Sequence, residues 1–328
     1  MFQLEVAPGV TFMEGEWRGR FPSGNVLVLE GSRTRAIVDT GAGEEVLSAV
    51  AARGRVDVVI NTHYHIDHVR GNGRFLGEGG ADFWCPAGEA GALASWEEFL
   101  RYTGFDVFGT SEAFQFRQAL GWAATPVARE LADGDVLDFG GLEAVVLRLP
   151  GHTPGHSGLW FPSLQVVFSA DIDLSRFGPW YGDVHADIDE YLDSLHRLGR
   201  LVEEASAGGR RRLTILTSHR RPLDDEGFRR YVPAFEAKFA EREQRILALL
   251  AAGGPQTTLD LARQWPVYGP GTLARSLPGF LKAEYFMVKH HMDRLARAGQ
   301  VRLAQPDGAP SATTDSDHVG GNQLWQAL

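Results

Sequence analysis

Three histidines and one aspartate occur within six residues of one short stretch: His63, His65, Asp67 and His68. Imidazole and carboxylate groups are common ligands of divalent metals. His63 and His65 are two residues apart after an apolar run, and in an extended chain that spacing points both side chains the same way. Asp67 and His68 follow at a turn and can face a second point nearby. A polar loop with chance histidines is the alternative interpretation, and the density of ligand types argues against it.

Three further stretches place ligand-type residues directly after expected strands. In chain order these residues are His152 and His156, then Asp171, then His219. Sheet proteins tend to collect functional groups in the loops that follow strands. Five of the histidines and two of the aspartates suffice for two adjacent metal ions. One ion would take three histidines and the other two histidines and a carboxylate, with the second aspartate bridging.

The elements expected around these residues alternate between strands and helices. Two neighbouring strands end at Asp39, a helical pattern follows, and the apolar run at 56–60 leads directly into the first histidines. Further strands are expected at 82–86, 143–149, 158–161, 165–169 and 213–217, and a helix at about 187–206. Strand-rich halves with helices between them predict two sheets packed together with helices outside.

Two regions depart from this alternation. Residues 89–130 are rich in aromatic residues and mostly helical in pattern. From about residue 236 the chain shows three helical patterns, the first ending at Gly253 and the third at Gly299, and then two short strands. We therefore expect a catalytic domain over 1–235 and a small C-terminal winged-helix domain over 236–328.

The composition limits the classes of protein to consider. The chain has 328 residues, of which 44% are hydrophobic and 23% charged, as in ordinary globular proteins. A single cysteine, Cys85, excludes an internal disulfide and fits a reducing compartment, so we expect a cytoplasmic location. We expect no signal peptide and no membrane partner, because no basic start or long apolar run is present. The net charge of −10 argues against polyanionic substrates.

The motifs HxHxDH and GHTPGH, an aspartate after a strand and a late histidine together resemble the metallo-β-lactamase superfamily. The likeness covers roughly residues 8–235 and includes the segment IVDTG. It implies an α/β fold, an αββα sandwich with the site at one edge of both sheets. The ligands it implies are His63, His65 and His152 for one metal and Asp67, His68 and His219 for the other, with Asp171 bridging and Asp39 and His156 orienting the ligands. Asp173 is a rival for the bridging role, and Asp171 is preferred because it keeps the family's position.

The resemblance also implies the chemistry. We expect two divalent metal ions, most simply zinc, with iron or manganese as alternatives for the same ligands. The two ions would share a bridging water and lower its pKa, which gives a hydroxide nucleophile near neutral pH. Asp67 can orient that hydroxide or accept its proton, so it is the candidate catalytic residue. The expected reaction is hydrolysis of a small ester, thioester or lactone, similar to that of glyoxalase II-type hydrolases.

Aromatic side chains are expected around the acyl substrate. Insertions in this superfamily usually cover the metal site, so residues 89–130 are interpreted as an apolar lid. Its aromatic residues are Trp96, Phe99, Tyr102, Phe105, Phe108, Phe114, Phe116 and Trp122. The segment after Asp171 is expected to add Phe177, Trp180, Tyr181 and His185 to the substrate pocket. The alternative is that these aromatic residues fill a core between helices.

The tail leaves a second function open. A body of this superfamily followed by a winged helix resembles the group that includes a mitochondrial single-strand-specific endoribonuclease, and winged helices often bind nucleic acid. Residues 241–328, however, carry nine Lys and Arg against eight Asp and Glu, which is not a strongly basic tail. Cleavage of single-stranded RNA is therefore the alternative function. Other roles for the tail are packing on the body, completing one wall of the active-site cleft, or forming a homodimer. A non-enzymatic binding protein is disfavoured by the full set of ligands.

Overall fold

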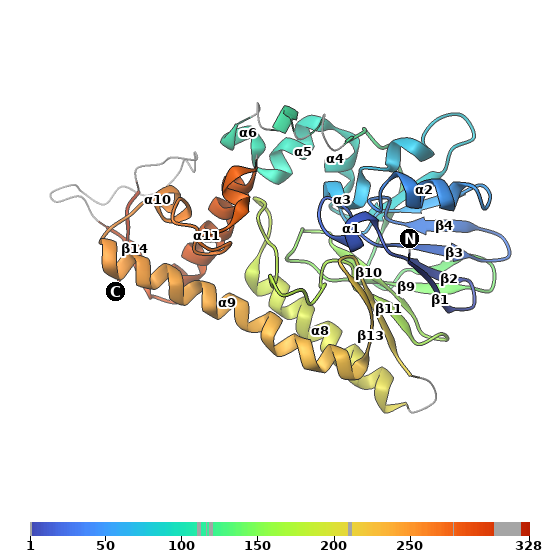
Figure 1. Cartoon of the computed structure of the whole chain (residues 1–328). Helices are drawn as coiled ribbons and strands as arrows, with labels where there is room; N and C mark the ends of the chain where they lie inside the picture. The colour runs from blue at the N-terminus through green and yellow to red at the C-terminus, as the bar shows by residue number, and fades with distance from the viewer. Residues whose placement is uncertain are drawn as a thin grey trace.

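The computed structural model describes residues 2–109, 113–115, 117, 121–208, 212–277, 279–304 and 323–328. Within these residues two β-sheets face each other, and helices cover their outer sides (Figure 1). The αββα sandwich predicted from the sequence is confirmed.

The first sheet is built from the N-terminal part of the chain. Among the described residues it has seven strands, which lie side by side in sequence order. They are β1 (Gln3–Ala7), β2 (Val10–Met13), β3 (Val26–Glu30), β4 (Arg35–Val38), β5 (Val58–Ile60), β6 (Asp82–Pro86) and β7 (Val127–Leu131). Strands β1 to β4 pair antiparallel, whereas β4 to β7 pair parallel. The loops that follow β4, β5 and β6 therefore leave the sheet at the same edge.

The second sheet has six strands in the described part of the chain, in the order β13-β12-β11-β10-β9-β8. They are β8 (Val136–Asp138), β9 (Glu143–Arg148), β10 (Ser157–Phe161), β11 (Val166–Phe168), β12 (Thr214–Thr217) and β13 (Arg220–Asp224). Strands β11 and β12 are parallel, and β9 runs in the same direction because it and β11 both pair antiparallel with β10. The loops after β9, β11 and β12 consequently meet at one edge of this sheet.

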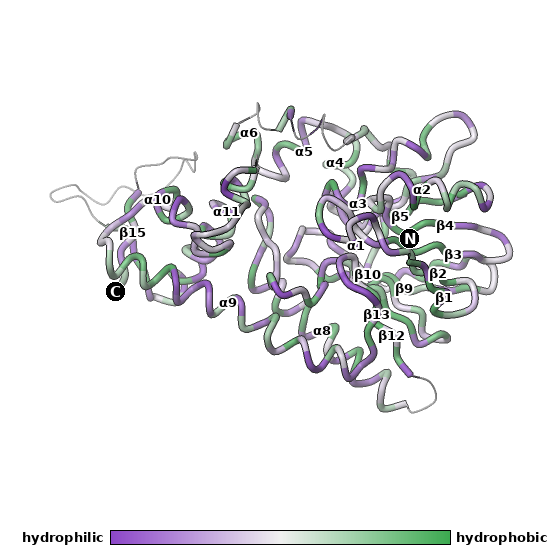
Figure 2. Tube along the Cα trace, viewed as in Figure 1, coloured by the Kyte–Doolittle hydropathy of each residue, from purple (hydrophilic) through white to green (hydrophobic). Residues whose placement is uncertain are grey.

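Apolar side chains fill the space between the two sheets. Phe12 and Leu27 of the first sheet share one fully buried cluster with Phe161 and Phe168 of the second. The green, hydrophobic stretches in Figure 2 run along the strands, as expected when one or both faces of a strand are buried. This core fixes the two sheets face to face and brings their loop-bearing edges together.

Amphipathic helices cover the outer faces. On the first sheet lies α2 (Glu44–Ala51), and on the second lie α8 (Ile188–Ala207) and the 29-residue α9 (Asp225–Gly253). Aspartate caps begin both long helices, because the side chains of Asp187 and Asp224 accept hydrogen bonds from backbone N–H groups of the first turn. Green and purple alternate along α8 and α9 in Figure 2, which is the pattern of helices buried on one side.

Short helices occupy the loops of the first sheet. They are α1 (Glu16–Gly19), α3 (Ile66–Val69), the 3-10 turn η1 (Asn72–Phe75), α4 (Ala90–Ala94), α5 (Trp96–Thr103) and α6 (Phe105–Phe108). The last three lie in the aromatic-rich insertion, which is mostly helical from Ala90 to Phe108, as the sequence predicts, whereas its last residues enter strand β7. Phe116 of that insertion lies outside the described residues.

The C-terminal region follows α9 without a break. Its elements are α10 (Thr258–Ala262), the 3-10 turn η2 (Leu273–Ser276), α11 (Phe280–Arg297), β14 (Val301–Leu303) and β15 (Trp325–Ala327). The helices and the paired strands expected here are present, and their identification as a winged helix stays a prediction. The expected domain boundary at residue 235 falls inside α9, and residues on both sides of it share one apolar cluster. None of the helices in the described ranges is both long and apolar enough to cross a membrane.

Candidate metal centre

All the ligand-type residues singled out in the sequence lie in loops at one edge of the sandwich. His63 and His65 follow β5, and Asp67 and His68 lie in the short helix α3 directly after them. From the second sheet, His152 follows β9, Asp171 follows β11, and His219 lies between β12 and β13. The parallel direction of these strands brings four separate stretches of sequence to one place.

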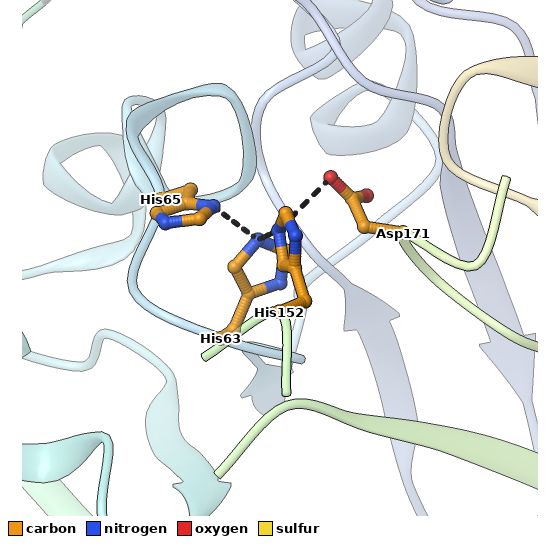
Figure 3. Close-up of side chains that lie close together, drawn as sticks. All are labelled: His63, His65, His152 and Asp171. Atoms are coloured by element: carbon orange, nitrogen blue, oxygen red, sulfur yellow. Dashed lines mark hydrogen bonds and ion pairs between the residues drawn. The ribbon is translucent and has the colours of Figure 1, made fainter. Parts of the chain in front are cut away.

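The first ligand group consists of His63, His65, His152 and Asp171, each of which offers one ligand atom within 4.8 Å of the others. In Figure 3 the three imidazoles converge, and the Asp171 carboxylate approaches His152 from the side away from His65. The Nε2 atom of His63 lies 3.0 Å from Nδ1 of His65 and 3.2 Å from Nε2 of His152. Burial and then the neighbouring imidazoles lower the pKa values of His63 and His65, which favours the neutral rings that a cation can bind.

The second ligand group consists of Asp67, His68 and His219, whose ligand atoms also lie within 4.8 Å of one another. Asp171 stands between the two groups. Its Oδ2 atom is 3.3 Å from Nε2 of His152 and 3.4 Å from Nε2 of His219. Its Oδ1 atom is 3.1 Å from Nε2 of His68. This is the position that a bridging carboxylate requires.

Asp173, the rival for the bridging role, belongs to neither ligand group. Its Oδ1 atom accepts a hydrogen bond of 3.0 Å from the backbone N–H of Ser175. Burial raises the pKa of Asp173 to about 6. The geometry therefore favours Asp171 over Asp173 as the link between the groups.

The two residues expected to orient ligands do contact the centre. Asp39 Oδ2 accepts a hydrogen bond of 2.8 Å from His68 Nδ1, which turns the other ring nitrogen toward Asp171. His156 donates from Nδ1 to the carbonyl of Leu149 at 2.7 Å and accepts at Nε2 from the backbone N–H of Asp171 at 3.1 Å. Contacts of this kind fix the tautomer and the direction of a metal-binding ring.

Three further hydrogen bonds orient histidines of the two ligand groups, and none of them was predicted from the sequence. Asp183 Oδ2 accepts from His65 Nε2 at 2.8 Å, and backbone carbonyls of Trp180 and Gly19 accept from Nδ1 of His152 and His219 at 2.7 and 2.6 Å. Two of these acceptors are backbone atoms, which no residue type reveals. The sequence contains one weak indication that Asp183 lies near the site, because it is close to the aromatic residues that follow Asp171. The lower pKa of Asp183 has opposing causes: burial raises it, and Lys282 and His65 outweigh burial.

A buried glutamate connects the two main histidine loops, and the sequence did not single it out. Glu89 Oε2 accepts from the backbone N–H of Tyr64 at 2.9 Å. Its Oε1 atom accepts from Thr153 Oγ1 and from the backbone N–H of Gly155, both at 2.7 Å. Burial raises the pKa of Glu89 to about 7 against the lowering effect of these three donors. One side chain after β6 thus holds the loop of His63 and His65 against the loop of His152.

The donors at the centre fit divalent metal ions. His68 Nε2 and Asp171 Oδ1 are buried and lie 3.1 Å apart, but neither atom makes a well-aligned hydrogen bond with any described residue. Buried polar atoms are costly to leave unpaired, and a cation would satisfy both. Burial lowers the pKa of His219, but the nearby carboxylates of Asp171 and Asp67 outweigh burial and raise it to about 10. That excess of negative charge favours a cation, which would displace the proton.

A pocket of about 610 Å³ opens beside the two ligand groups. His65, Asp67, His152, Asp171 and His219 all form part of its wall. The rest of the wall includes seven aromatic residues and four basic ones. The aromatic residues are Phe21, Phe99, Phe105, Phe177, Trp180, Tyr268 and Phe280, and the basic ones are Arg20, Arg176, Arg220 and Lys282. Tyr268 and Phe280 come from the C-terminal region, which therefore completes one wall of the cleft, as one of the alternatives for the tail proposed.

The residues expected in the pocket divide into two pairs. Phe177 and Trp180 line the pocket. The expectation for Tyr181 is wrong, because this side chain is fully buried, stacks on Phe239 and is hydrogen-bonded to His291 at 2.7 Å. The C-terminal helices cover that side of the segment. His185 is exposed and contacts the ring of Tyr102, so it is not part of the wall either.

The aromatic insertion has both of the roles considered for it. Phe99 and Phe105 line the pocket. Trp96 stacks on Phe99 with ring centroids 5.0 Å apart and contacts Trp122 at 5.3 Å, so these rings build a small core of their own. The insertion therefore covers the site with two of its rings and supports them with others.

Comparisons with known proteins agree with this geometry. The family model described as "Metallo-beta-lactamase superfamily" matches residues 19–209. A hydroxyacylglutathione hydrolase of Synechococcus sp. (strain JA-3-3Ab) is 29% identical over 224 residues, which cover 68% of this chain and 73% of that protein. The protein of the same name from Methylococcus capsulatus (strain ATCC 33009 / NCIMB 11132 / Bath) is 28% identical over 265 residues, or 78% and 87% of the two chains.

A solved structure shares the fold over the whole chain. It is a metallo-beta-lactamase family protein from Thermus thermophilus, with a TM-score of 0.68 and 22% identity, and the match covers 98% of this chain and 100% of the other. The C-terminal region is thus part of the shared fold. With a family model that spans more than half of its residues, the chain belongs to the metallo-beta-lactamase superfamily.

Proposed function

We propose that this chain is a dinuclear hydrolase that cleaves a small ester, thioester or lactone with an apolar acyl part. It is a metal-dependent hydrolase by virtue of its superfamily. The observation that carries the finer proposal is the place of Asp171, between two ligand groups and on the wall of an aromatic pocket. That arrangement offers room for two cations and for a small acyl substrate at the same point.

The residues of the two ligand groups have distinct proposed roles in metal binding and catalysis. His63, His65 and His152 would hold one divalent cation, and the second ligand group the other, with Asp171 shared. Divalent cations bound there supply Lewis acidity and make a bound water acidic. Asp67 lies on the pocket wall, 3.4 Å from His219 Nε2, where its carboxylate can orient an attacking water and accept its proton. Zinc is the proposed metal, because neutral imidazoles and carboxylates suit it, as they do iron and manganese.

Two observations support an acyl substrate. The relatives named hydroxyacylglutathione hydrolase are thioesterases by name, and they match most of this chain. The pocket wall also carries aromatic rings from the insertion, from the segment after Asp171 and from the C-terminal region. Such rings bind an apolar group, and Arg20, Arg176 and Arg220 on the same wall can pair with an anionic part of the substrate.

The alternative, cleavage of single-stranded RNA, finds little support in the C-terminal region. The basic residues of α11 are engaged with carboxylates rather than presented to solvent alone. Their partners are Asp183 for Lys282, Asp293 for Lys289, Asp189 and Glu243 for Arg294, and Asp189 for Arg297. Phosphate contacts would have to compete with these pairs, so we keep the acyl substrate as the proposed class.

A hydrolysis screen tests the proposal. The purified protein would be stripped with chelator, reconstituted with Zn²⁺ and offered thioesters, esters, lactones, β-lactams, phosphodiesters and single-stranded RNA. We expect turnover of an acyl substrate and none in the matched variant Asp171→Asn. Salt-sensitive cleavage of single-stranded RNA with no turnover of any acyl substrate would contradict the proposal.

A further inference from the structure

A lysine from the C-terminal region lies buried beside the metal centre. Lys282 is in the first turn of α11 and is 3% exposed. Its Nζ atom donates to the carbonyl of Thr103 at 2.8 Å, to the carbonyl of Gly182 at 2.9 Å and to Asp183 Oδ1 at 2.5 Å. An ammonium group has three N–H donors, and each has an acceptor here. All three donors of Lys282 are therefore used inside the protein, although part of its side chain also lines the pocket.

The other oxygen of Asp183 leads to the first ligand group. Its Oδ2 atom accepts from His65 Nε2 at 2.8 Å and from the hydroxyl of Tyr64 at 2.9 Å. Because Nε2 of His65 is engaged, the remaining ring nitrogen, Nδ1, faces His63 at 3.0 Å. A continuous chain of contacts therefore runs from Lys282 through Asp183 to His65.

The C-terminal region holds the same segment at several other points. His290 Nε2 donates to the backbone carbonyl of Asp183 at 2.7 Å. Trp180 Nε1 donates to the hydroxyl of Tyr268 at 2.7 Å, and Arg242 of the preceding helix α9 donates to the carbonyl of Pro179 at 2.6 Å. This segment also orients a second ligand, because the carbonyl of Trp180 accepts from His152 Nδ1 at 2.7 Å. We define residues 179–183 as the clamp segment.

We propose that Lys282 is a positioning residue of the metal centre: it fixes the Asp183 carboxylate so that His65 presents Nδ1 to the first metal ion. The proposal rests on the metal centre proposed above and extends it into the C-terminal region. A carboxylate behind a histidine fixes the ring and makes it a better ligand. A buried carboxylate that loses its counter-ion is itself unstable and moves or recruits another partner.

The test measures zinc affinity rather than activity. Lys282→Met keeps the length of the side chain and removes the ammonium group. We expect the dissociation constant of the first Zn²⁺, measured by competition with a chromophoric chelator, to rise about 10- to 100-fold. The absorption spectrum of the Co²⁺-loaded variant should change as well, because the direction of one ligand changes.

Arg294→Gln is the matched control. Arg294 lies on the same helix and also ties α11 to the body, through Asp189 at 2.8 Å and Glu243 at 2.5 Å, but it is not part of the pocket wall. We expect its zinc affinity to stay within about twofold of the wild type, since neither Asp189 nor Glu243 belongs to a ligand group or to the clamp segment. An equal loss of affinity in both variants would mean that Lys282 only holds the C-terminal region in place, and would overturn the proposal.

Two more variants keep the test decisive if Lys282→Met does not fold. Asp183→Asn removes the charge that Lys282 balances, and the double variant Asp183→Asn with Lys282→Met buries no lone charge. Because both residues act through one chain of contacts, the double variant should bind zinc about as weakly as Asp183→Asn alone. Wild-type zinc affinity in the double variant would overturn the role of Lys282. Absence of zinc binding by the wild-type protein would instead refute the metal centre itself.

Discussion

The two ligand groups are held in place by different parts of the molecule. In the first group, His65 and His152 are oriented by Asp183 and by the carbonyl of Trp180, both in the clamp segment. In the second group, His68 and His219 are oriented by Asp39 after β4 and by the carbonyl of Gly19, both in the N-terminal sheet region. The second group is thus a product of the sandwich alone, whereas the first depends on the C-terminal region. Changes in the C-terminal region should therefore affect one metal position before the other.

Removal of the metals is the broadest way to test this comparison. We expect two ions per chain after reconstitution, and complete loss of hydrolysis when a strong chelator removes both. Elemental analysis during stepwise removal should show two phases, because the two positions have different surroundings. A metal content that never rises above about one ion per chain would show that the groups form a single site.

Loss of the shared ligand should be almost as severe. Asp171→Ala removes a carboxylate that contacts both groups, with His68, His152 and His219 all within 3.4 Å of it. We expect kcat/KM for the acyl substrate to fall at least about 10³-fold, since the variant loses both metal affinity and the orientation of water. Circular dichroism checks that the sandwich remains folded. Activity near the wild-type level would place the reaction elsewhere.

A pair of conservative variants sharpens the difference between the groups. Asp39→Asn weakens the partner of His68, and Asp183→Asn weakens the partner of His65. We expect each to raise one zinc dissociation constant about 10- to 100-fold and to leave the other nearly unchanged. Asp39 has a φ of 60°, a left-handed conformation that asparagine tolerates, so the backbone should keep its shape. If both variants weakened the same ion, the two groups would not be held independently.

The smallest expected effect concerns the pocket wall. Phe280→Ala removes an aromatic ring that the C-terminal region adds to the pocket. We expect KM for an apolar acyl substrate to rise about 10-fold with kcat little changed, because the lost contact is made in the ground state and the transition state alike. Trp17→Ala is the control, since Trp17 is 68% exposed and does not line this pocket. Equal kinetics for Phe280→Ala and the wild type would remove the C-terminal region from substrate binding.

The sequence reveals the ligand-type residues well because each directly follows an apolar strand. A strand pattern predicts where the chain leaves the sheet, so the positions of His63, His152, Asp171 and His219 could be derived before the fold was seen. The αββα arrangement follows from the same alternation of strands and helices. The spacing of the ligand-type residues and their position after strands both involve neighbouring residues in the chain. Features of this kind can be recognised in a single sequence.

The residues that hold these side chains in place have no comparable local signal. Glu89, Asp183 and Lys282 are single charged residues outside any motif, and their partners lie 64, 118 and 99 positions away. Tyr181 was misplaced for a related reason, because the C-terminal helices that cover it pack there only in three dimensions. Tertiary packing determines which side of a loop is buried, and the loop's own sequence has no periodic pattern that predicts it.

The continuity of α9 determines what the chain would lose if it were shortened at the expected domain boundary. This helix runs from Asp225 to Gly253 with apolar residues on both sides of the expected domain boundary in one cluster. A gene shortened at that boundary would still encode every residue of both ligand groups, yet it would lose the surface against which the clamp segment is held. We therefore expect a chain shortened there to keep all the ligands and yet to bind the first metal ion more weakly than the full chain.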